Sequence, residues 1–305
     1  MPRPENMGAI YQAVMLRFQH VQGREAELPI HHRCRSTLMT HGEMARKAIV
    51  YFHGFTSCPA QGSALAVRLY ALGFNVYLPR MFGHGGTDPK RFSMANLNAQ
   101  GLIEMAEESI EIASGLGEEV FVIGLSAGGT IASWVAQNRN DVARVVTVSP
   151  FFGPFKLPRQ AIEGASRMLL KIPNVVIRWN PLSNIASQHV DYPFSLPATH
   201  ALAEIMLLGQ RVQKDAATRP PSTQSIRVLL NEADRSVSNA VTMGIVNCWR
   251  THGPDVSVET LPFQHRLPHD LINPFEKGND FERVYMSLVR LLSLNSKQCC
   301  ALTGP

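Results

Sequence analysis

The chain has 305 residues, of which 45% are hydrophobic and 17% are charged. That balance is typical of a globular protein with a sizeable core, built either as one large domain with an insertion or as two ordinary domains. The net charge is +5, but lysine and arginine are scattered along the sequence and form no basic run. A nucleic-acid partner is therefore not expected.

The cysteines and the hydropathy of the chain exclude further classes. The cysteines are odd in number and lack zinc-ligand spacing, so they predict neither a disulfide framework nor a metal site. They are Cys34, Cys58, Cys248, Cys299 and Cys300. No apolar signal segment follows Met1, and no stretch reaches the roughly 18 continuous apolar residues of a membrane helix. We therefore expect a cytoplasmic protein.

Short apolar runs alternate with helical patterns along the first half of the chain. The β-branched and aromatic runs are typical of buried strands, and the stretches between them repeat apolar residues at helical spacing. The elements predicted in chain order are a helix at about 8–22, a strand at 48–52, a helix at 64–72, a strand at 74–78, a helix at about 96–114, a strand at 120–123, a helix at about 127–138 and a strand at 145–148.

The second half interrupts this alternation and then resumes it. Strands are predicted at 226–230 and 256–261, and helical patterns at about 158–171 and 199–214. Strands separated by helices predict a largely parallel sheet flanked by helices, an α/β fold. We interpret the segment before residue 226 as a helical cap over the carboxyl edge of the sheet. The predicted division is a core of 1–150 and 226–305, with an N-terminal extension of about 1–45, and an inserted cap of 151–225.

The most informative motif lies where the strand at 120–123 changes into a helix. The segment Gly124-Leu125-Ser126-Ala127-Gly128-Gly129-Thr130 places small residues around one serine. A strand that turns into a helix within one residue brings backbone segments close together, and larger side chains there would collide. The serine hydroxyl would be exposed on this turn, below the free N–H groups of the new helix. Ser126 is therefore the candidate nucleophile.

A serine hydroxyl needs a base within hydrogen-bond reach, and that base needs a carboxylate to orient it. Asp234 follows the strand at 226–230 after a short turn, which puts it at the same sheet edge as Ser126. His269 lies after the final strand, just ahead of the C-terminal helix. The order serine, aspartate, histidine is the one expected of an α/β hydrolase.

Rival residues remain for both supporting roles. His265 also follows the final strand, but His269 is favoured because it is followed by the helix-leading Asp270-Leu271-Ile272, which resembles the α/β-hydrolase pattern. Glu232 competes with Asp234 for the acid role. Asp255 precedes its strand, which would place it at the wrong edge of the sheet.

Taken together, the motifs resemble those of the α/β-hydrolase superfamily, and within it those of capped carboxylesterases and monoacylglycerol-lipase-like serine hydrolases. The resemblance covers roughly residues 46–292. The motifs that carry it are His53-Gly54-Phe55, Gly83-His84-Gly85, Gly124 to Gly129, Asn231 to Asp234 and Leu267 to Ile272. The resemblance implies the α/β-hydrolase fold with a Ser126, Asp234 and His269 triad.

The resemblance also assigns the residues around the nucleophile. It implies an oxyanion hole made by the backbone N–H groups of Phe55 and Ala127. His53 is then interpreted as a residue that braces its loop, and His84 as part of a glycine-rich loop at the rim of the site. Cys58 is interpreted as a small packing residue.

The chemistry expected of this set is ester hydrolysis through an acyl-enzyme, without a metal or an organic cofactor. Related enzymes with other reactions carry aspartate at the elbow, so serine favours acyl transfer. Short- to medium-chain carboxylic esters or monoacylglycerols are the first choice of substrate. Thioesters, lactones, amides and carbon–carbon bonds remain alternatives, as does a protein that binds a small ligand without turning it over.

An apolar pocket for the acyl group is expected beneath the cap. The candidate substrate-binding residues are Phe82, Phe151, Trp179 and Met206. The alternative for most apolar residues of the cap is that they only bury its helices against the core. The apolar cap and the basic balance also leave docking on a membrane surface open. The sequence does not determine the oligomeric state.

Overall fold

A computed structural model of the chain describes residues 4–87, 94–176 and 197–293. Its centre is a seven-stranded sheet with the order β1-β3-β2-β4-β5-β6-β7. β1 pairs antiparallel with β3, and the other neighbours are parallel. The strands are β1 Thr37–Met39, β2 Ala45–Phe52, β3 Phe74–Leu78, β4 Gly117–Leu125, β5 Arg144–Val148, β6 Ser225–Asn231 and β7 Asp255–Leu261. The predicted α/β-hydrolase sheet is confirmed.

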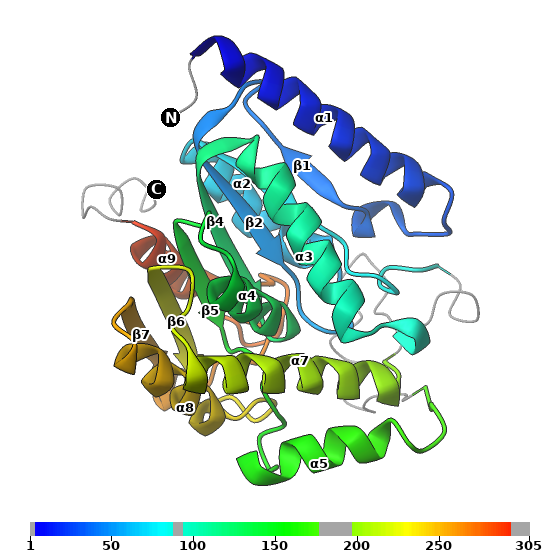
Figure 1. Cartoon of the computed structure of the whole chain (residues 1–305), viewed down its shortest axis with the longest axis vertical. Coiled ribbons are helices and arrows are strands. Elements are labelled where there is room, and N and C mark those ends of the chain that lie inside the picture. Colours follow the sequence, from blue (N-terminus) through cyan, green and yellow to red (C-terminus); the bar gives the residue numbers. More distant parts are fainter. Residues whose placement is uncertain (1–3, 88–93, 177–196, 294–305) are drawn as a thin grey trace.

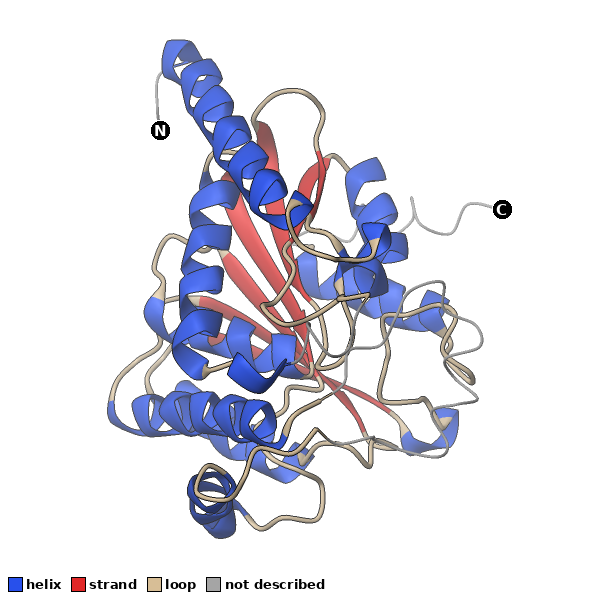
Figure 2. Ribbon diagram, turned by 90° about the vertical axis from the view of Figure 1, so that its right-hand side faces the viewer, coloured by secondary structure: helices blue, strands red, loops and turns tan. Residues whose placement is uncertain are grey.

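Helices cover both faces of this sheet (Figures 1 and 2). The α-helices are α1 Pro4–Ala26, α2 Ser63–Ala71, α3 Ala99–Ser114, α4 Ala127–Asn138, α5 Arg159–Leu169, α7 Thr199–Thr218, α8 Asn239–Thr251 and α9 Phe281–Leu292. Short 3-10 helices are η1 His32–Cys34, η2 Pro59–Gly62, η3 Met94–Asn96 and η5 Phe263–His265. Helices α1, α3, α4, α7 and α8 share one apolar cluster with the sheet, and α2 and α9 share the other.

The central strands are apolar on both faces because both faces are covered. Alternate side chains of β2 enter opposite clusters: Ala48, Val50 and Phe52 on one face, Ile49 and Tyr51 on the other. Successive residues of a strand point to opposite sides, so a strand buried between two helical layers needs a continuous apolar run. This is the physical reason that the short runs predicted strands.

The register of the strands aligns their carboxyl ends. Phe52 pairs with Gly124, Leu125 pairs with Val148, and Val148 pairs with Leu229. The loops that follow β2, β4, β5 and β6 therefore emerge at one edge of the sheet. In parallel sheets this edge is where ligands bind.

Helices α5 and α7 lie between β5 and β6 in the sequence. α7 contacts α3, α4 and α8, and α5 packs on α7, on its outer side in Figure 1. The buried side chains of α7 belong to the same apolar cluster as those of α3 and α4; they include Ala201, Ile205, Met206, Leu208 and Val212. That residues 151–225 form a separate cap stays a prediction.

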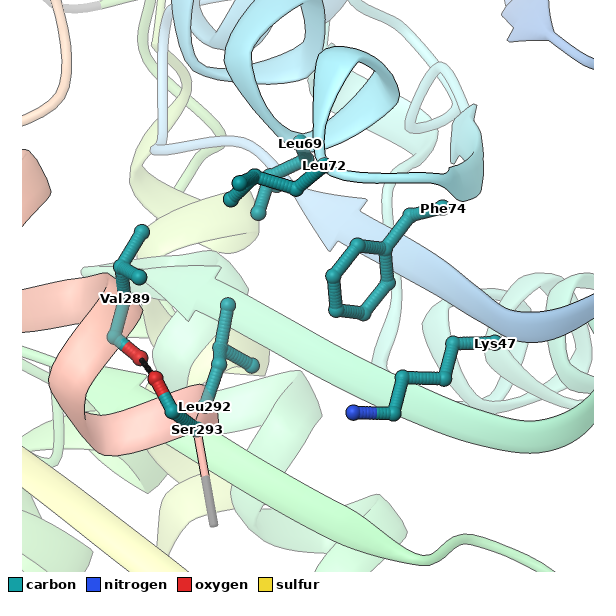
Figure 3. Close-up of a pocket in the computed structure, with 7 residues that line it drawn as sticks. All are labelled: Lys47, Leu69, Leu72, Phe74, Val289, Leu292 and Ser293. Atoms are coloured by element: carbon teal, nitrogen blue, oxygen red, sulfur yellow. Dashed lines mark hydrogen bonds between the residues drawn. The ribbon is translucent and has the colours of Figure 1, made fainter. Parts of the chain in front are cut away.

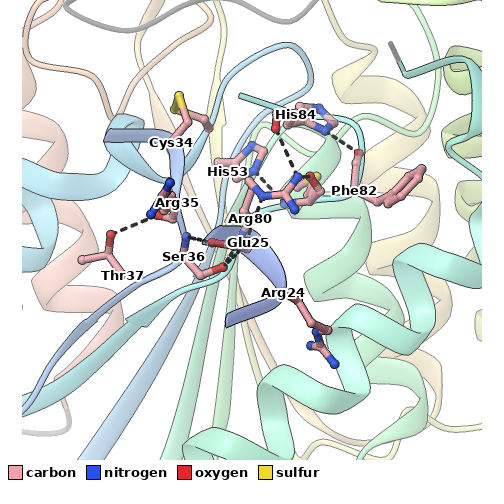
Figure 4. A network of polar contacts seen from close by, with 12 residues as sticks. Arg24, Glu25, Cys34, Arg35, Ser36, Thr37, His53, Arg80, Phe82 and His84 are labelled. Atoms are coloured by element: carbon pink, nitrogen blue, oxygen red, sulfur yellow. Dashed lines mark hydrogen bonds and ion pairs between the residues drawn. A yellow bond between two sulfur atoms is a disulfide. The ribbon is translucent and has the colours of Figure 1, made fainter. Parts of the chain in front are cut away.

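Helix α1 is fastened to the loop after β3 by a buried ion pair. Glu25 Oε1 lies 3.0 Å from Arg80 Nε, and both side chains are at most 7% exposed. The Glu25 carboxylate also accepts hydrogen bonds from the backbone N–H and the hydroxyl of Ser36. Arg80 donates in turn to the carbonyl oxygen of His84. Figure 4 shows this network between the end of α1 and the His84 loop.

The expectation of no disulfide was wrong. Cys34 and Cys58, which are 24 positions apart, form a disulfide, and both are fully buried. The bond joins η1 to the loop that precedes η2, so Cys58 is more than a small packing residue. Neither spacing nor cysteine number predicted the pairing, because it depends on two loops that meet only in the fold. Cys248 is a free, half-buried cysteine, and Cys299 and Cys300 lie outside the described residues.

Within the described ranges, none of the helices combines the length and the apolar character needed to span a bilayer.

Candidate active site

The turn between β4 and α4 holds Ser126 in an uncommon backbone conformation. Its φ of 56° and ψ of −114° lie outside the regions that most side chains adopt, and such strain is typical of a nucleophile elbow. A Cβ at Gly124 would lie 2.0 Å from the carbonyl oxygen of Gly128, and one at Gly128 would lie 2.0 Å from that of Phe52. The glycines are therefore needed for the close approach of strand and helix.

Three side chains from three loops meet above this elbow. His269 Nε2 lies 2.9 Å from the Ser126 hydroxyl oxygen. His269 Nδ1 lies 2.6 Å from Asp234 Oδ2. The carboxylate is an acceptor, so Nδ1 carries the proton and Nε2 accepts from the serine hydroxyl. Ser126 lies 143 positions from His269, and His269 lies 35 positions from Asp234, yet the three form one hydrogen-bonded chain.

Asp234 is buried but ionised. Its burial tends to raise the pKa, yet hydrogen bonds from His269 and from the backbone N–H groups of Ser236 and Val237 hold the pKa below the ordinary value. The side chain is fully buried. A buried carboxylate held in this way fixes the tautomer of the neighbouring imidazole and stabilises its protonated form.

Asn231 supports the acid and base loops, and the sequence reasoning did not assign it this role. Its Nδ2 donates to the carbonyl oxygens of Leu267 and Pro268, each at 3.0 Å. Its Oδ1 accepts from the backbone N–H of Ala233. The fully buried Asn231 side chain therefore ties the turn before Asp234 to the loop before His269.

The rival residues lie in other environments. The Glu232 carboxylate accepts a hydrogen bond from the backbone N–H of Phe263, 2.8 Å away. Asp255 pairs with Arg227 at the amino end of β7, away from the elbow. His265 belongs to η5, and within the described ranges its side chain makes no hydrogen bond to Ser126 or Asp234.

The two backbone N–H groups predicted to form the oxyanion hole belong to residues that follow β2 and β4 at the carboxyl edge of the sheet. Phe55 follows β2, and Ala127 opens α4, where a helix has unsatisfied N–H groups. Neither N–H donates to another residue of the described ranges. The Phe55 loop is fixed by a left-handed Thr56, with φ of 70°, and by a hydrogen bond from Ser57 N–H to the Gly54 carbonyl.

His53 and His84 are fully buried beneath this loop. His53 Nε2 accepts from the Met81 backbone N–H, so its Nδ1 is protonated and donates to the Gly54 carbonyl. Burial holds the pKa of His53 well below its ordinary value. Burial likewise lowers the pKa of His84 to about 4. Both rings are therefore neutral near pH 7 and support the loops around the site.

The predicted substrate-binding residues differ in exposure. Phe82 is 56% exposed, and Figure 4 shows its ring directed away from those of His53 and His84. Phe151 is half-buried and packs against the core. Met206 is 1% exposed within α7 and belongs to the larger apolar cluster. Trp179 lies outside the described residues.

One small pocket lined by described residues lies away from the serine. The pocket in Figure 3 lies between α2, the start of β3 and the end of α9, and its space of about 10 Å³ suits a single water molecule. Lys47 and Phe74, which line it, belong to the amino-terminal parts of β2 and β3. It is therefore at the edge opposite Ser126. No group of histidine, cysteine, aspartate and glutamate suited to a metal is present within the described ranges.

The sheet, the elbow and the hydrogen-bonded serine, histidine and aspartate define an α/β hydrolase. The profile of the family described as serine aminopeptidase, S33, matches residues 43–255. This match covers more than half of the chain, so the chain belongs to that family.

Similar proteins include several lipolytic enzymes. A thermostable monoacylglycerol lipase from Bacillus sp. (strain H-257) is 28% identical over 109 residues, which is 36% of this chain and 42% of the relative. The match thus spans less than half of that relative's length.

Solved structures share the fold at low sequence identity. The monoacylglycerol lipase of Paleococcus ferrophilus has a TM-score of 0.63 and 16% identity, over 84% of this chain and 97% of that one. A soluble variant of the monoglyceride lipase of Saccharomyces cerevisiae has a TM-score of 0.64 and 13% identity, over 85% and 90% of the two chains.

Proposed function

We propose that this protein is a serine hydrolase that cleaves carboxylic esters, either short- to medium-chain acyl esters or monoacylglycerols. The observation that carries the proposal is the hydrogen-bonded chain from Ser126 through His269 to Asp234. The name of the Bacillus relative supports the substrate class. Membership of a hydrolase family supports the reaction type.

The first half of the reaction forms an acyl-enzyme. The Ser126 hydroxyl oxygen attacks the ester carbonyl carbon while His269 Nε2 takes the hydroxyl proton. Asp234 stays ionised and stabilises the imidazolium that forms. The N–H groups of Phe55 and Ala127 stabilise the negative charge on the former carbonyl oxygen. The imidazolium then gives its proton to the leaving alkoxide, and the alcohol departs.

The second half returns the enzyme to its starting state. His269 removes a proton from a water molecule, whose oxygen attacks the acyl carbon. The tetrahedral intermediate collapses, the carboxylic acid leaves, and the proton returns to the Ser126 oxygen. Every proton passes through one imidazole, so the reaction depends on the position of His269 relative to the oxyanion donors.

The direct test is hydrolysis of a chain-length series of p-nitrophenyl esters by the wild type and by single alanine variants. Ser126→Ala and His269→Ala are expected to lose most turnover, because each removes a reacting group, with a fall in kcat of about 10⁶-fold for comparable enzymes. His265→Ala, the matched histidine control, is expected to keep near-normal rates. Full activity of Ser126→Ala would contradict the proposal. Loss of activity in His265→Ala, with His269→Ala active, would assign the role of general base to His265.

Phosphonylation identifies the nucleophile independently of turnover. A fluorophosphonate is expected to add its phosphonyl group to the Ser126 oxygen, detected as a mass increase on the peptide that contains this residue. His269→Ala is expected to label far more slowly, because the hydroxyl then lacks its base. Labelling of another residue, with the Ser126 peptide unmodified, contradicts the assignment.

The acyl pocket and the cap belong to the same proposal. Phe82, Phe151, Trp179 and Met206 remain the candidate lining, and the cap remains residues 151–225. Exposed Phe82 provides the sharpest probe. Phe82→Ala is expected to raise KM for long-chain esters more than for short ones, because it removes apolar contact area from the longer acyl group. An equal change across the series speaks against acyl contact.

A cytoplasmic location is the remaining part of the proposal. Disulfides persist mainly in oxidising compartments and are rare in the cytosol. The Cys34–Cys58 pair therefore provides the test of location. Alkylation of thiols at the moment of cell lysis is expected to modify both cysteines, as detected by peptide mass. A pair that resists alkylation until it is reduced contradicts a cytoplasmic location.

A further inference from the structure

We propose that Gln61 is a positioning residue which, through Asp270, couples the oxyanion loop to the loop that carries the general base. The inference rests on the proposed function and deepens it, since it names what holds the donors and the base in register. Within the described ranges the hydrogen bonds of the Gln61 side chain go to Tyr51, Gly54 and Asp270 and not to the nucleophile or the general base, so its effect on the reaction is transmitted through its neighbours.

One end of the Gln61 amide is bonded to the oxyanion side of the site. Its Oε1 accepts from the backbone N–H of Gly54 at 2.8 Å and from the hydroxyl of Tyr51 at 2.9 Å. Gly54 directly precedes Phe55, whose N–H is the proposed oxyanion donor. The residue is 4% exposed, so these bonds are shielded from competing water.

The other end of the amide is bonded to the base side. Gln61 Nε2 donates to Asp270 Oδ2 at 2.9 Å, across 209 positions of sequence. The second oxygen of Asp270 accepts from the backbone N–H groups of Ile272 and Asn273. Asp270 directly follows His269, so its carboxylate fixes the turn from which the general base projects.

The chemistry of the amide makes this bridge directional. Two N–H or O–H donors face Oε1 and a carboxylate faces Nε2, so a flipped amide would place donors against donors. Burial raises the pKa of Asp270, while the hydrogen bonds from Gln61 and the backbone oppose this rise. The Gln61–Asp270 hydrogen bond joins these two loops directly.

The bridge matters because the reaction requires two distances to be correct at the same time, one from the general base to the serine oxygen and one from the Phe55 N–H to the oxyanion. The base must remain within hydrogen-bond reach of the serine oxygen while the Phe55 N–H faces the developing oxyanion. A displacement of about 1 Å between such groups costs about 10²-fold in rate. A bond that joins the two loops directly limits their relative movement and so maintains the rate. A contact that only stabilises the fold changes the free energy of unfolding and not the rate.

Exchange of the donor and acceptor across the bridge tests this role. Gln61→Glu keeps an oxygen for Gly54 and Tyr51 but sets a carboxylate against Asp270. Asp270→Asn keeps an oxygen for its backbone donors but sets an NH₂ group against that of Gln61. The double variant Gln61→Glu/Asp270→Asn restores one hydrogen bond in the reverse direction.

Each single variant is expected to lower kcat for a p-nitrophenyl ester by about 10- to 100-fold, with little change in KM, because alignment and not substrate binding is impaired. The double variant is expected to recover most of this loss. Single variants with wild-type kcat overturn the inference. So does a double variant that is no faster than the slower single variant.

A second buried glutamine provides the matched control. Gln137 accepts from Trp249 Nε1 at 2.8 Å and donates to the carbonyl oxygens of Arg219 and Pro220, at the far end of α4 from the elbow. Gln137→Glu is expected to lower the melting temperature while kcat stays within about twofold of wild type. An equal loss of kcat in this variant would mean that general destabilisation explains both results.

A measurement without substrate separates this inference from the proposed function. The imidazole N–H resonance of His269, observed by NMR in the free protein, reports the hydrogen bond to Asp234. Each single variant is expected to shift or broaden it and the double variant to restore it. If Ser126→Ala retained full activity, the proposed function would fail. The His269 N–H resonance would still show whether Gln61 couples the two loops. An unchanged resonance in both single variants overturns the bridge.

Discussion

Individual residues in this chain have sharply defined roles where loops from distant parts of the sequence meet. Ser126, His269 and Asp234 are joined by hydrogen bonds of 2.9 and 2.6 Å. Asn231 and Gln61 hold the surrounding loops from beneath. On the surface such side chains exchange hydrogen bonds with water. At this edge of the sheet burial removes the competing water, so each side chain keeps one set of hydrogen-bond partners.

Replacement of Asp234 tests the tautomer argument. Asp234→Asn leaves the size of the side chain nearly unchanged but removes the charge that stabilises the imidazolium and selects its tautomer. A fall in kcat of about 10⁴-fold is expected, measured with a p-nitrophenyl ester, with unchanged circular dichroism. Glu232→Gln, the neighbouring carboxylate, is the control and is expected to retain activity. The opposite ranking of these variants would return the acid role to Glu232.

The close approach of the Gly128 backbone to the end of β2 leads to a second prediction for a single residue. A Cβ on Gly128 would lie 2.0 Å from the Phe52 carbonyl oxygen, so Gly128→Ala is expected to lower the free energy of unfolding by about 1–3 kcal/mol or more. Gly164, in the exposed part of α5, has nothing within 4 Å of its Cβ position. Gly164→Ala is the control and is expected to be neutral or stabilising by about 0.5–1 kcal/mol. Urea unfolding of both variants measures the difference, and equal stability contradicts the steric argument.

At the scale of elements, local sequence predicted the central pieces well and the boundaries less well. β3 spans the predicted 74–78. α3 begins at Ala99 because the Asn98 side chain caps it by accepting from Gly101 N–H, while the residues before it form η3. β1 has only three residues, too few to show an alternating pattern. α8 was not predicted, although Ser238 caps it in the same way as Asn98 caps α3.

The disulfide links two elements, and its removal tests their connection. In protein purified without reductant, Cys34→Ser/Cys58→Ser is expected to lose about 3 kcal/mol of unfolding free energy, because closing a loop of this size restricts the unfolded chain. Thermal unfolding measures the loss. Reductant should lower the melting temperature of the wild type but not of the double variant, and Cys248→Ser serves as the control. Wild-type protein insensitive to reductant would contradict the prediction.

At the scale of the whole molecule, the apolar layers on the two faces of the sheet determine which titratable side chains are buried. His53 and His84 lie fully buried where the layers meet the carboxyl edge. Both have a lowered pKa because burial disfavours their charged form. The folded chain thus excludes protons that the unfolded chain binds, and its stability depends on pH for this reason.

The sign of this dependence follows from the two states. The pKa of His84 is about 4 in the folded protein against 6.5 for the free side chain, so between these values the unfolded state binds more protons. The unfolding free energy therefore falls as pH decreases from 6.5 towards 4, by up to about 1.4 kcal/mol per pH unit for this residue.

A variant isolates the contribution of His84. His84→Asn keeps an N–H that can donate to the Phe82 carbonyl but cannot titrate, so its unfolding free energy should depend less steeply on pH in this window. Urea unfolding at several pH values measures both slopes. Groups away from His84 and His53, which include Asp234 and Asp270, are common to the two proteins and cancel in the difference. Loss of the His84 charge also raises the pKa of His53, which changes the slope in the same direction. Parallel slopes would show that His84 does not titrate on unfolding.

The sequence by itself determined the order of the strands β2 to β7, most of the helices between them, the glycine-lined elbow at Ser126 and the choice of His269 and Asp234 as its candidate partners. The elements and the elbow follow from local rules, since apolar periodicity, small residues at a tight turn and the position of a loop after a strand can all be read within a few residues. The choice of His269 also used the resemblance to α/β hydrolases. The candidate triad could therefore be named before any contact was known.

Only the tertiary structure decided which distant side chains meet beneath the site. The Cys34–Cys58 disulfide, the Glu25–Arg80 ion pair and the Gln61–Asp270 bond all join segments that are far apart in the sequence. Their partners are chosen by the register of the parallel strands and by the layers that bury them. Neither the register nor the layers can be read from a few neighbouring residues. A polar side chain stands in the same local sequence whether water or a buried partner forms its hydrogen bonds.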